Sequence, residues 1–178
     1  MDVRRIALIG HSGAGKSACL FSLEIDRKTC DMDAVLGTQH CPPLASALDW
    51  LTSNSGVREI VVVSNHEQML FEMRQAKLDG QHADVFNKFL LVYLHKPKDE
   101  LREHLAKPSA GGRNRDPAGV NYTLDHYDSL HNLFCQLADR TVECSQKSIE
   151  DVATQIKGIA QYLRVNPTKP GIVVDGGT

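Results

Sequence analysis

One eight-residue segment restricts the possible folds of this chain more than any other feature. It follows an apolar, β-prone run at residues 3–9 and precedes SACLFSLE, which is compatible with a helix. The segment fits GxxxxGK[ST] at every fixed position and reads Gly10, His11, Ser12, Gly13, Ala14, Gly15, Lys16 and Ser17. Because this motif joins a strand to a helix, and both flanks have that character, the segment predicts a phosphate-binding loop.

Each fixed position of the loop has a chemical reason. Glycines let the backbone turn its N–H groups toward phosphate oxygens, and a helix beginning near Lys16 adds the positive end of its dipole. We expect Lys16 to reach the β- and γ-phosphates of a nucleotide, and the Ser17 hydroxyl to ligate Mg²⁺. The alternative is a glycine-rich turn that only links strand to helix, which complete agreement with the motif makes a minor possibility.

The rest of the chain alternates between strand-like and helix-like segments. Strands are predicted at residues 3–9, 27–30, 58–64, 89–94 and 139–144, and helices at 42–51, 66–78, 96–106, 122–138 and 148–163. Continuous apolar strands are typical of a parallel sheet covered on both faces. The pattern predicts a three-layer α/β/α sandwich with a parallel sheet of about five strands, the nucleotide kinase-like form of the P-loop NTPase fold.

A length of 178 residues suits one domain. We expect that domain to cover residues 1–164 and to include a mobile lid at about 107–121, where PSAGGRNRDPAGVN is polar and rich in Gly and Pro. Residues 165–178 are Pro- and Gly-rich and are expected to form a tail that is only partly ordered.

Two carboxylates follow the predicted second strand, at Asp31 and Asp33. In a parallel sheet the carboxyl ends of strands face the ligand crevice, so both should lie near the phosphate loop. An extended DxD places both side chains on one face, so one of them can hold Mg²⁺ through water while the other accepts a hydrogen bond from a substrate hydroxyl. The alternative is a solvated turn, in which Asp is common.

The lid carries Arg113 and Arg115. Closure of such a loop could place a guanidinium on a transferring phosphate and exclude water. An ordinary basic surface loop is the alternative.

Composition excludes several classes of function. With 20 Lys plus Arg against 22 Asp plus Glu, the net charge of −2 disfavours nucleic acid as a ligand. The apolar run near the start ends at Gly10, too short for a signal peptide or a membrane span, so a cytoplasmic protein is expected. The five cysteines and eight histidines lack metal-ligand spacing, and we expect no zinc and no disulfide framework, with most cysteines buried.

The order of these parts resembles shikimate kinase and related small-molecule kinases. The resemblance covers most of residues 3–163 and rests on GHSGAGKS, CDMD, LLVYLHKPKDELREHL, GGRNRDP and LFCQLADRTVECSQKSIEDVATQI. It implies ATP and Mg²⁺ as cofactors and a small-molecule acceptor as partner, in a monomer or homodimer. It also implies roles for individual residues: phosphates and Mg²⁺ for Lys16 and Ser17, the outer shell of the metal for Asp31, the acceptor hydroxyl for Asp33, the lid for Arg115, and the adenine for Lys147.

The acceptor pocket departs from that family. Shikimate kinases carry three glycines after the third strand, where this chain has Ser64, Asn65 and His66, and the position of a later substrate arginine is Leu130. Asn65 and His66 either contact a different acceptor or only cap the following helix.

These features favour an ATP-dependent phosphotransferase acting on a small hydroxylated molecule. Two alternatives stay open: a nucleotide-binding regulatory ATPase with a protein partner, and a relative that has lost catalysis.

Overall fold

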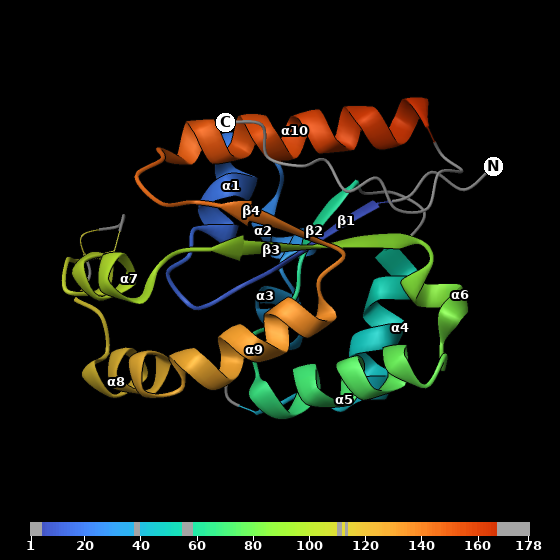
Figure 1. Ribbon diagram of the computed structural model, residues 1–178, viewed down its shortest axis with the longest axis horizontal. Helices are drawn as coiled ribbons and strands as arrows, with labels where there is room; N and C mark the ends of the chain where they lie inside the picture. The colour runs from blue at the N-terminus through green and yellow to red at the C-terminus, as the bar shows by residue number, and fades with distance from the viewer. Residues whose placement is uncertain (1–4, 38–39, 55–58, 110–111, 113, 167–178) are drawn as a thin grey trace.

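Parallel strands in the order β2-β1-β3-β4 form the middle layer of the structure (Figure 1). The computed structural model describes residues 5–37, 40–54, 59–109, 112 and 114–166. The strands of this part of the chain are β1 (Arg5–Ile9), β2 (Ile60–Val62), β3 (Phe89–His95) and β4 (Arg140–Glu143). In register, Leu8 of β1 lies beside Val62 of β2 on one side and Val92 of β3 on the other.

Helices cover both faces of the sheet. Along β1, Ile6 and Leu8 belong to one buried cluster while Ala7 and Ile9 belong to the other, as the two-residue period of a strand requires. The first cluster packs on α1 (Lys16–Ser22), α2 (Arg27–Cys30) and α10 (Ile149–Val165). The second packs on α3 (Met32–Leu36), α4 (Leu44–Asn54), α5 (Glu67–Leu78), α6 (Ala83–Phe86) and α9 (Tyr127–Leu137). The predicted three-layer α/β/α sandwich is confirmed.

A further pair of helices lies at the carboxyl ends of the strands, at the left of Figure 1. They are α7 (Lys98–Leu105) and α8 (Pro117–Asp125). Leu101 and Leu105 of α7 form a small buried cluster with Tyr127 of α9, and Val120 and Leu124 of α8 pack against it. None of the helices in the described part of the chain is long and apolar enough to cross a membrane.

The prediction of a strand at residues 27–30 is wrong. Asp26 caps a short helix there, its carboxylate accepting hydrogen bonds from the Lys28 amide at 3.0 Å and the Thr29 hydroxyl at 2.8 Å. This local cap competes successfully with the weak β-propensity of four residues. In the described residues, the expected fifth strand is reduced to a single parallel β-bridge between Asp31 and Val62.

Two other boundaries differ from the prediction. The expected lid loop at 107–121 ends early, because Asp116 caps α8 and Pro117 occupies the first helical position. The helix predicted at 122–138 is divided at His126, which ends α8 and precedes α9. The His126 side chain makes no capping hydrogen bond to α9, and its Nδ1 instead lies 2.9 Å from the Tyr122 carbonyl oxygen in α8. The helices predicted at 42–51, 66–78, 96–106 and 148–163 are present as α4, α5, α7 and α10, whereas the short helices α3 and α6 were not predicted. The helix α10 starts with a capping box between Ser148 and Asp151.

No disulfide joins any of the cysteines in the described structure. Cys19, Cys30 and Cys144 are buried, while Cys41 and Cys135 are exposed, so the prediction that most are buried is confirmed.

Candidate active site

The phosphate loop connects β1 to α1 and is held closely by neighbouring helices. Gly13 and Gly15 have φ angles of 83° and 100°, which residues with a side chain rarely adopt. A Cβ atom would lie 2.7 Å from Leu105 of α7 if placed on Gly13, and 2.8 Å from Ile149 of α10 if placed on Gly15. Glycine is therefore favoured at both positions by the backbone conformation, and a Cβ atom would also displace the ends of these two side chains. Of the other loop residues, Gly10 and Ala14 are buried and Ser12 is exposed.

Lys16 folds back over its own loop. Its Nζ donates to the carbonyl oxygens of Gly10 at 2.5 Å and His11 at 3.0 Å. Burial lowers the pKa of Lys16 to about 8, against the opposing effect of the negative charges on Asp33 and, to a smaller degree, Asp31. The ammonium group thus occupies a poorly solvated place, which strengthens its attraction for an anion. The two carboxylates in its electrostatic reach act in the opposite direction.

Ser17 and Asp31 are joined directly. The Ser17 hydroxyl donates to Asp31 Oδ2 at 2.8 Å, and Arg27 Nε donates to the same oxygen at 2.9 Å. Asp31 Oδ1 accepts from the Asp33 amide at 3.1 Å and so caps α3. Asp31 is therefore a buried carboxylate, and both of its oxygens already accept hydrogen bonds. Such a group suits an indirect role, in which it positions the residues or waters that contact a ligand.

The pair Asp31 and Asp33 does not have the extended geometry that the sequence predicts. Asp33 lies in the first turn of α3, where residues two apart do not share a face. The cap formed by Asp31 favours the helix over an extended strand end. Asp33 still interacts with Lys16, and its Oδ1 is buried without a hydrogen-bond partner in the described structure. An unpaired carboxylate oxygen is costly to bury, so it marks a place where a ligand group is expected.

Arg115, the arginine expected on the lid, contacts the end of α7 and the residues that follow it. Arg115 donates from Nε to the Lys107 carbonyl at 3.2 Å and has Nη2 3.2 Å from His104 Nε2. His104 belongs to α7, the helix that packs on Gly13 through Leu105. Burial lowers the pKa of His104, and the charges of Lys96 and Arg115 lower it further, so a neutral ring faces the guanidinium. Arg113 lies outside the described residues.

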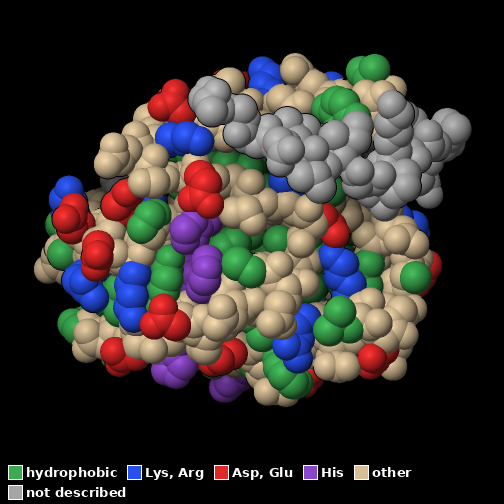
Figure 2. All heavy atoms as spheres, in the orientation of Figure 1, with side chains coloured by type: hydrophobic (Ala, Val, Ile, Leu, Met, Phe, Trp, Pro, Cys, Tyr) green, Lys and Arg blue, Asp and Glu red, His purple; other side chains and the backbone are tan. Residues whose placement is uncertain are grey.

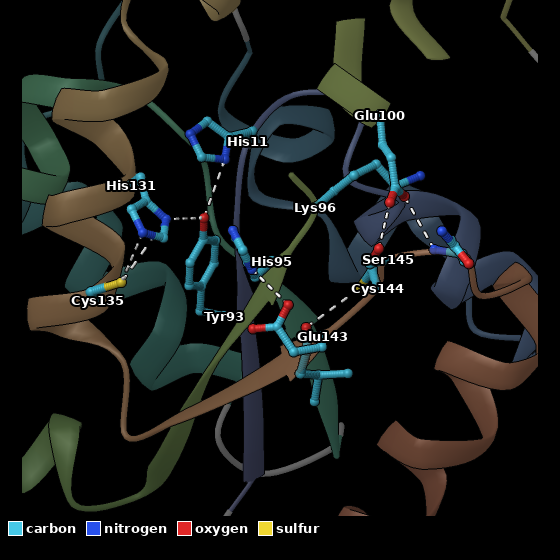
Figure 3. A network of polar contacts seen from close by, with 12 residues as sticks. His11, Tyr93, His95, Lys96, Glu100, His131, Cys135, Glu143, Cys144 and Ser145 are labelled. Carbon is cyan, nitrogen blue, oxygen red and sulfur yellow. Dashed lines mark hydrogen bonds and ion pairs between the residues drawn. The ribbon is translucent and has the colours of Figure 1, made fainter. Parts of the chain in front are cut away.

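Lys147 is exposed on the turn between β4 and α10, at the same edge of the sheet as the loop. Glu100 of α7 fixes this turn by accepting hydrogen bonds from the Ser145 hydroxyl and from the Gln146 amide, at 3.1 Å for the latter (Figure 3). These bonds keep the pKa of Glu100 below its usual value. The position of Lys147 is thereby defined, while its predicted contact with adenine stays a prediction.

Sequence analysis did not single out His11, because it occupies a variable position of the motif. Its side chain is fully buried, and its ring stacks on Tyr127 with centroids 4.2 Å apart and planes 6° apart. Nε2 lies 3.0 Å from the Tyr127 carbonyl. Since a carbonyl only accepts hydrogen bonds, the neutral ring carries its proton on Nε2 and leaves Nδ1 as an acceptor. His11 thus attaches the phosphate loop to the start of α9.

A network of rings continues from His11 toward the surface (Figure 3). The Tyr93 hydroxyl lies 3.4 Å from His11 Nδ1 and 2.9 Å from His131 Nδ1. His95 contacts Glu143 at 2.7 Å through Nδ1. On the face shown in Figure 2, histidine side chains reach the surface among acidic and apolar ones. No short sequence pattern indicates this network, because its members come from the loop, β3, β4 and α9.

The buried His11 should make stability depend on pH. Burial lowers the pKa of His11 from its usual 6.5 to about 4, and the nearby charge of Lys16 adds to that effect. The unfolded chain therefore takes up a proton near pH 6.5 that the folded protein takes up only near pH 4. We expect the free energy of unfolding to be about 3 kcal/mol higher above pH 6.5 than near pH 4 on account of His11, and to fall progressively between these two values.

Denaturant unfolding of wild type and His11→Phe between pH 4 and 7 checks this expectation. The variant keeps an aromatic ring on Tyr127 but cannot titrate. Its free energy of unfolding should fall less steeply than that of wild type, by up to about 1 kcal/mol per pH unit. Parallel curves would contradict the neutral, buried state of His11.

Two positions that the sequence places in an expected acceptor pocket have structural surroundings that limit their roles. Leu130, where the resemblance would place a substrate arginine, is 1% exposed and belongs to the core. His66 caps α5 through its backbone carbonyl, which accepts from the Leu70 amide at 3.0 Å, and its side chain makes no capping hydrogen bond.

Comparison with known proteins supports the fold alone. No protein-family model matches the chain, and no curated protein matches its sequence. Its structure is similar to that of a shikimate kinase from Acinetobacter baumannii in complex with shikimate, with 18% sequence identity and a TM-score of 0.52. The likeness covers 94% of this chain and 96% of that one. The chain therefore has the parallel α/β sandwich of the shikimate kinase type of P-loop NTPase fold, with four strands in the described residues where about five were predicted.

Proposed function

We propose that this protein is a small-molecule kinase that transfers the γ-phosphate of ATP to a hydroxyl group. The observation that carries the proposal is the pairing of a complete phosphate loop with Asp33. Lys16 supplies a poorly solvated cation, and Asp33 offers a buried oxygen without a partner within electrostatic reach of it. A nucleotide-binding turn alone would have no use for that second group.

The side chains beside Lys16 fit Mg²⁺. This ion prefers oxygen ligands and keeps several of its waters. The Ser17 hydroxyl provides one direct ligand, and Asp31, which already contacts that hydroxyl, would hold a metal-bound water. When bound, Mg²⁺ neutralises negative charge on the β- and γ-phosphate oxygens.

Individual side chains would bind the phosphates and orient the acceptor. Lys16 leaves the loop carbonyls to bind phosphate oxygens, and Asp33 accepts the hydrogen bond of the acceptor hydroxyl and orients it for in-line attack. Arg115 would move from His104 to the transferring phosphate when the lid closes. Arginines in this role contribute about 10³- to 10⁵-fold in rate in other phosphoryl-transfer enzymes.

Release of ADP tests the proposal. The purified protein is incubated with ATP and Mg²⁺ and screened against small alcohols, sugars, cyclitols and nucleosides by a coupled ADP assay. We expect at least one acceptor to raise ADP release well above the rate without acceptor, and Lys16→Ala to abolish the increase.

The same assay separates the alternatives. A regulatory ATPase would release ADP at one rate with every small acceptor, and a relative without catalysis would bind ATP without releasing ADP. Either result, obtained with protein that binds ATP in calorimetry, would overturn the kinase proposal.

A further inference from the structure

The hydroxyl of Tyr127 determines where one proton of His95 must lie. This hydroxyl donates its single proton to the Lys96 carbonyl oxygen at 2.9 Å. His95 Nε2 lies 3.2 Å from the same hydroxyl oxygen. Because the proton of Tyr127 is already used, the hydrogen bond between the two side chains requires an N–H on His95 Nε2, which donates to the Tyr127 oxygen.

The other ring nitrogen of His95 also carries a proton. His95 Nδ1 lies 2.7 Å from Glu143 Oε2 at the end of β4 (Figure 3). An ionised carboxylate only accepts hydrogen bonds, so Nδ1 must donate, and a ring that donates from both nitrogens is an imidazolium. The two contacts together therefore describe His95 as a charged side chain in an ion pair with Glu143.

The other titratable groups near His95 are compatible with this charge. The ring centroid of His131 is 4.9 Å away, and His131 can stay neutral because its Nδ1 can accept from the Tyr93 hydroxyl at 2.9 Å. Lys98 of α7 is paired with Asp128 of α9. The remaining groups in reach of the cluster are His11 of the phosphate loop, Lys96, Glu100 of α7 and Cys135 of α9. Lys96 and Glu100 carry opposite charges, so their effects on His95 oppose each other.

Tyr127 connects His95 to the phosphate loop. Its ring stacks on His11 with centroids 4.2 Å apart, and its carbonyl oxygen lies 3.0 Å from His11 Nε2. Lys16 also holds His11 in this structure, by donating to the His11 carbonyl oxygen at 3.0 Å. A nucleotide that draws Lys16 onto its phosphates would remove that bond. The position of His11 would then depend more strongly on Tyr127.

We propose that His95 is a positioning residue for the phosphate loop, whose imidazolium holds the Tyr127 hydroxyl in the place that nucleotide binding requires. This inference rests on the proposed function, because it assumes a nucleotide at the loop. Histidine is the side chain whose charge ordinarily changes between pH 5 and 8. A neutral His95 has one N–H and cannot donate to both Glu143 and Tyr127. Nucleotide affinity is therefore highest while His95 is charged and falls as the pH rises.

Calorimetric titration of wild type and His95→Gln with Mg²⁺ and a non-hydrolysable ATP analogue, from about pH 5.5 to 7.5, tests the proposal. The glutamine cannot titrate, but its amide can still donate to Tyr127. We expect the affinity of wild type to fall about 3- to 10-fold relative to the variant across this range, since one hydrogen bond is lost. Ionisation of the nucleotide affects both proteins alike, so the ratio of their affinities isolates His95. With a pKa of about 4 for His11 and about 8 for Lys16, both of these groups titrate mainly outside the range.

Tyr127→Phe distinguishes the hydrogen bond from a simple effect of charge. The variant keeps an aromatic ring on His11 and removes the hydroxyl to which His95 donates. We expect its affinity to follow pH as that of His95→Gln does, although His95 is still present. His126→Gln is the matched control, because this exposed histidine contacts Tyr122 of α8 instead. It should retain the pH dependence of wild type.

Two results would overturn the role of His95. A wild-type pH dependence in His95→Gln would place the titrating group elsewhere. A wild-type pH dependence in Tyr127→Phe would mean that the charge acts through space and not through the hydroxyl. The proposed function would survive both results, since it fails only if wild type does not bind the Mg²⁺–nucleotide complex or does not use an acceptor.

Discussion

Replacing Lys16 by methionine is expected to remove nucleotide binding and, at the same time, to stabilise the ligand-free protein. In the proposed function the ammonium group binds the phosphates, and loss of two charged hydrogen bonds corresponds to a fall in affinity of about 10²- to 10⁴-fold. Calorimetry with ATP and Mg²⁺ measures this fall. Equal affinity with and without Lys16 would mean that the loop is not the binding site.

The gain in stability follows from the lowered pKa of Lys16. The unfolded chain keeps this proton up to about pH 10.5, and the folded protein loses it near pH 8. The charged lysine therefore destabilises the fold fully below pH 8, and wild type should become more stable as the pH rises from 8 to 10.5. Partial solvation of the side chain and two lost hydrogen bonds reduce the gain at pH 7 to about 1–2 kcal/mol.

Denaturant unfolding of Lys16→Met at pH 7 and pH 10 measures that gain. Lys157→Met, on the exposed face of α10, serves as the control and should change neither stability nor nucleotide affinity. A less stable Lys16→Met protein would show that its hydrogen bonds to Gly10 and His11 outweigh the cost of burying the charge.

Separate replacement of the two aspartates should give different defects. With a true acceptor, Asp33→Asn is expected to keep ATP affinity and to lower turnover by about 10²- to 10⁴-fold, the usual contribution of a positioned base. Asp31→Asn should weaken the dependence on Mg²⁺. It should also lower the free energy of unfolding by about 1 kcal/mol, since the charged bonds to Arg27 and Ser17 are weakened.

Steady-state kinetics at several Mg²⁺ concentrations, with melting curves of both variants, measure the difference. If Asp33→Asn turned over acceptor at the wild-type rate, Asp33 would belong to a solvated turn. If both variants shared one defect in metal dependence, both residues would act on the metal, and the acceptor site would lie elsewhere.

The sequence predicts best what depends on residues close together in the chain. The phosphate loop is one continuous motif, and the apolar stripe of Leu130, Phe134 and Leu137 is buried as its helical spacing indicates. The capping box at Ser148 is likewise a local pattern. These features were predictable because their partners lie within one or two helical turns.

The errors and omissions have equally specific causes. The helix at Arg27–Cys30 depends on one capping side chain, Asp26, which outweighs a weak strand propensity. His11 contacts Tyr93 and Tyr127, more than 80 residues along the chain, so no window of sequence relates them. The unpaired atoms of Asp33 and Ser64 are properties of packing, which no sequence pattern reveals.

Asp31 has three structural roles at once. It forms a β-bridge with Val62, caps α3, and accepts a hydrogen bond from the hydroxyl of Ser17 in the phosphate loop. Natural selection would therefore act on Asp31 through folding even in a lineage with no need for the reaction. Asp33 contributes less to the fold, because its buried Oδ1 forms no hydrogen bond in the described structure. Among descendants of a common ancestor, replacement of Asp33 beside a retained Asp31 would therefore mark the loss of the proposed reaction.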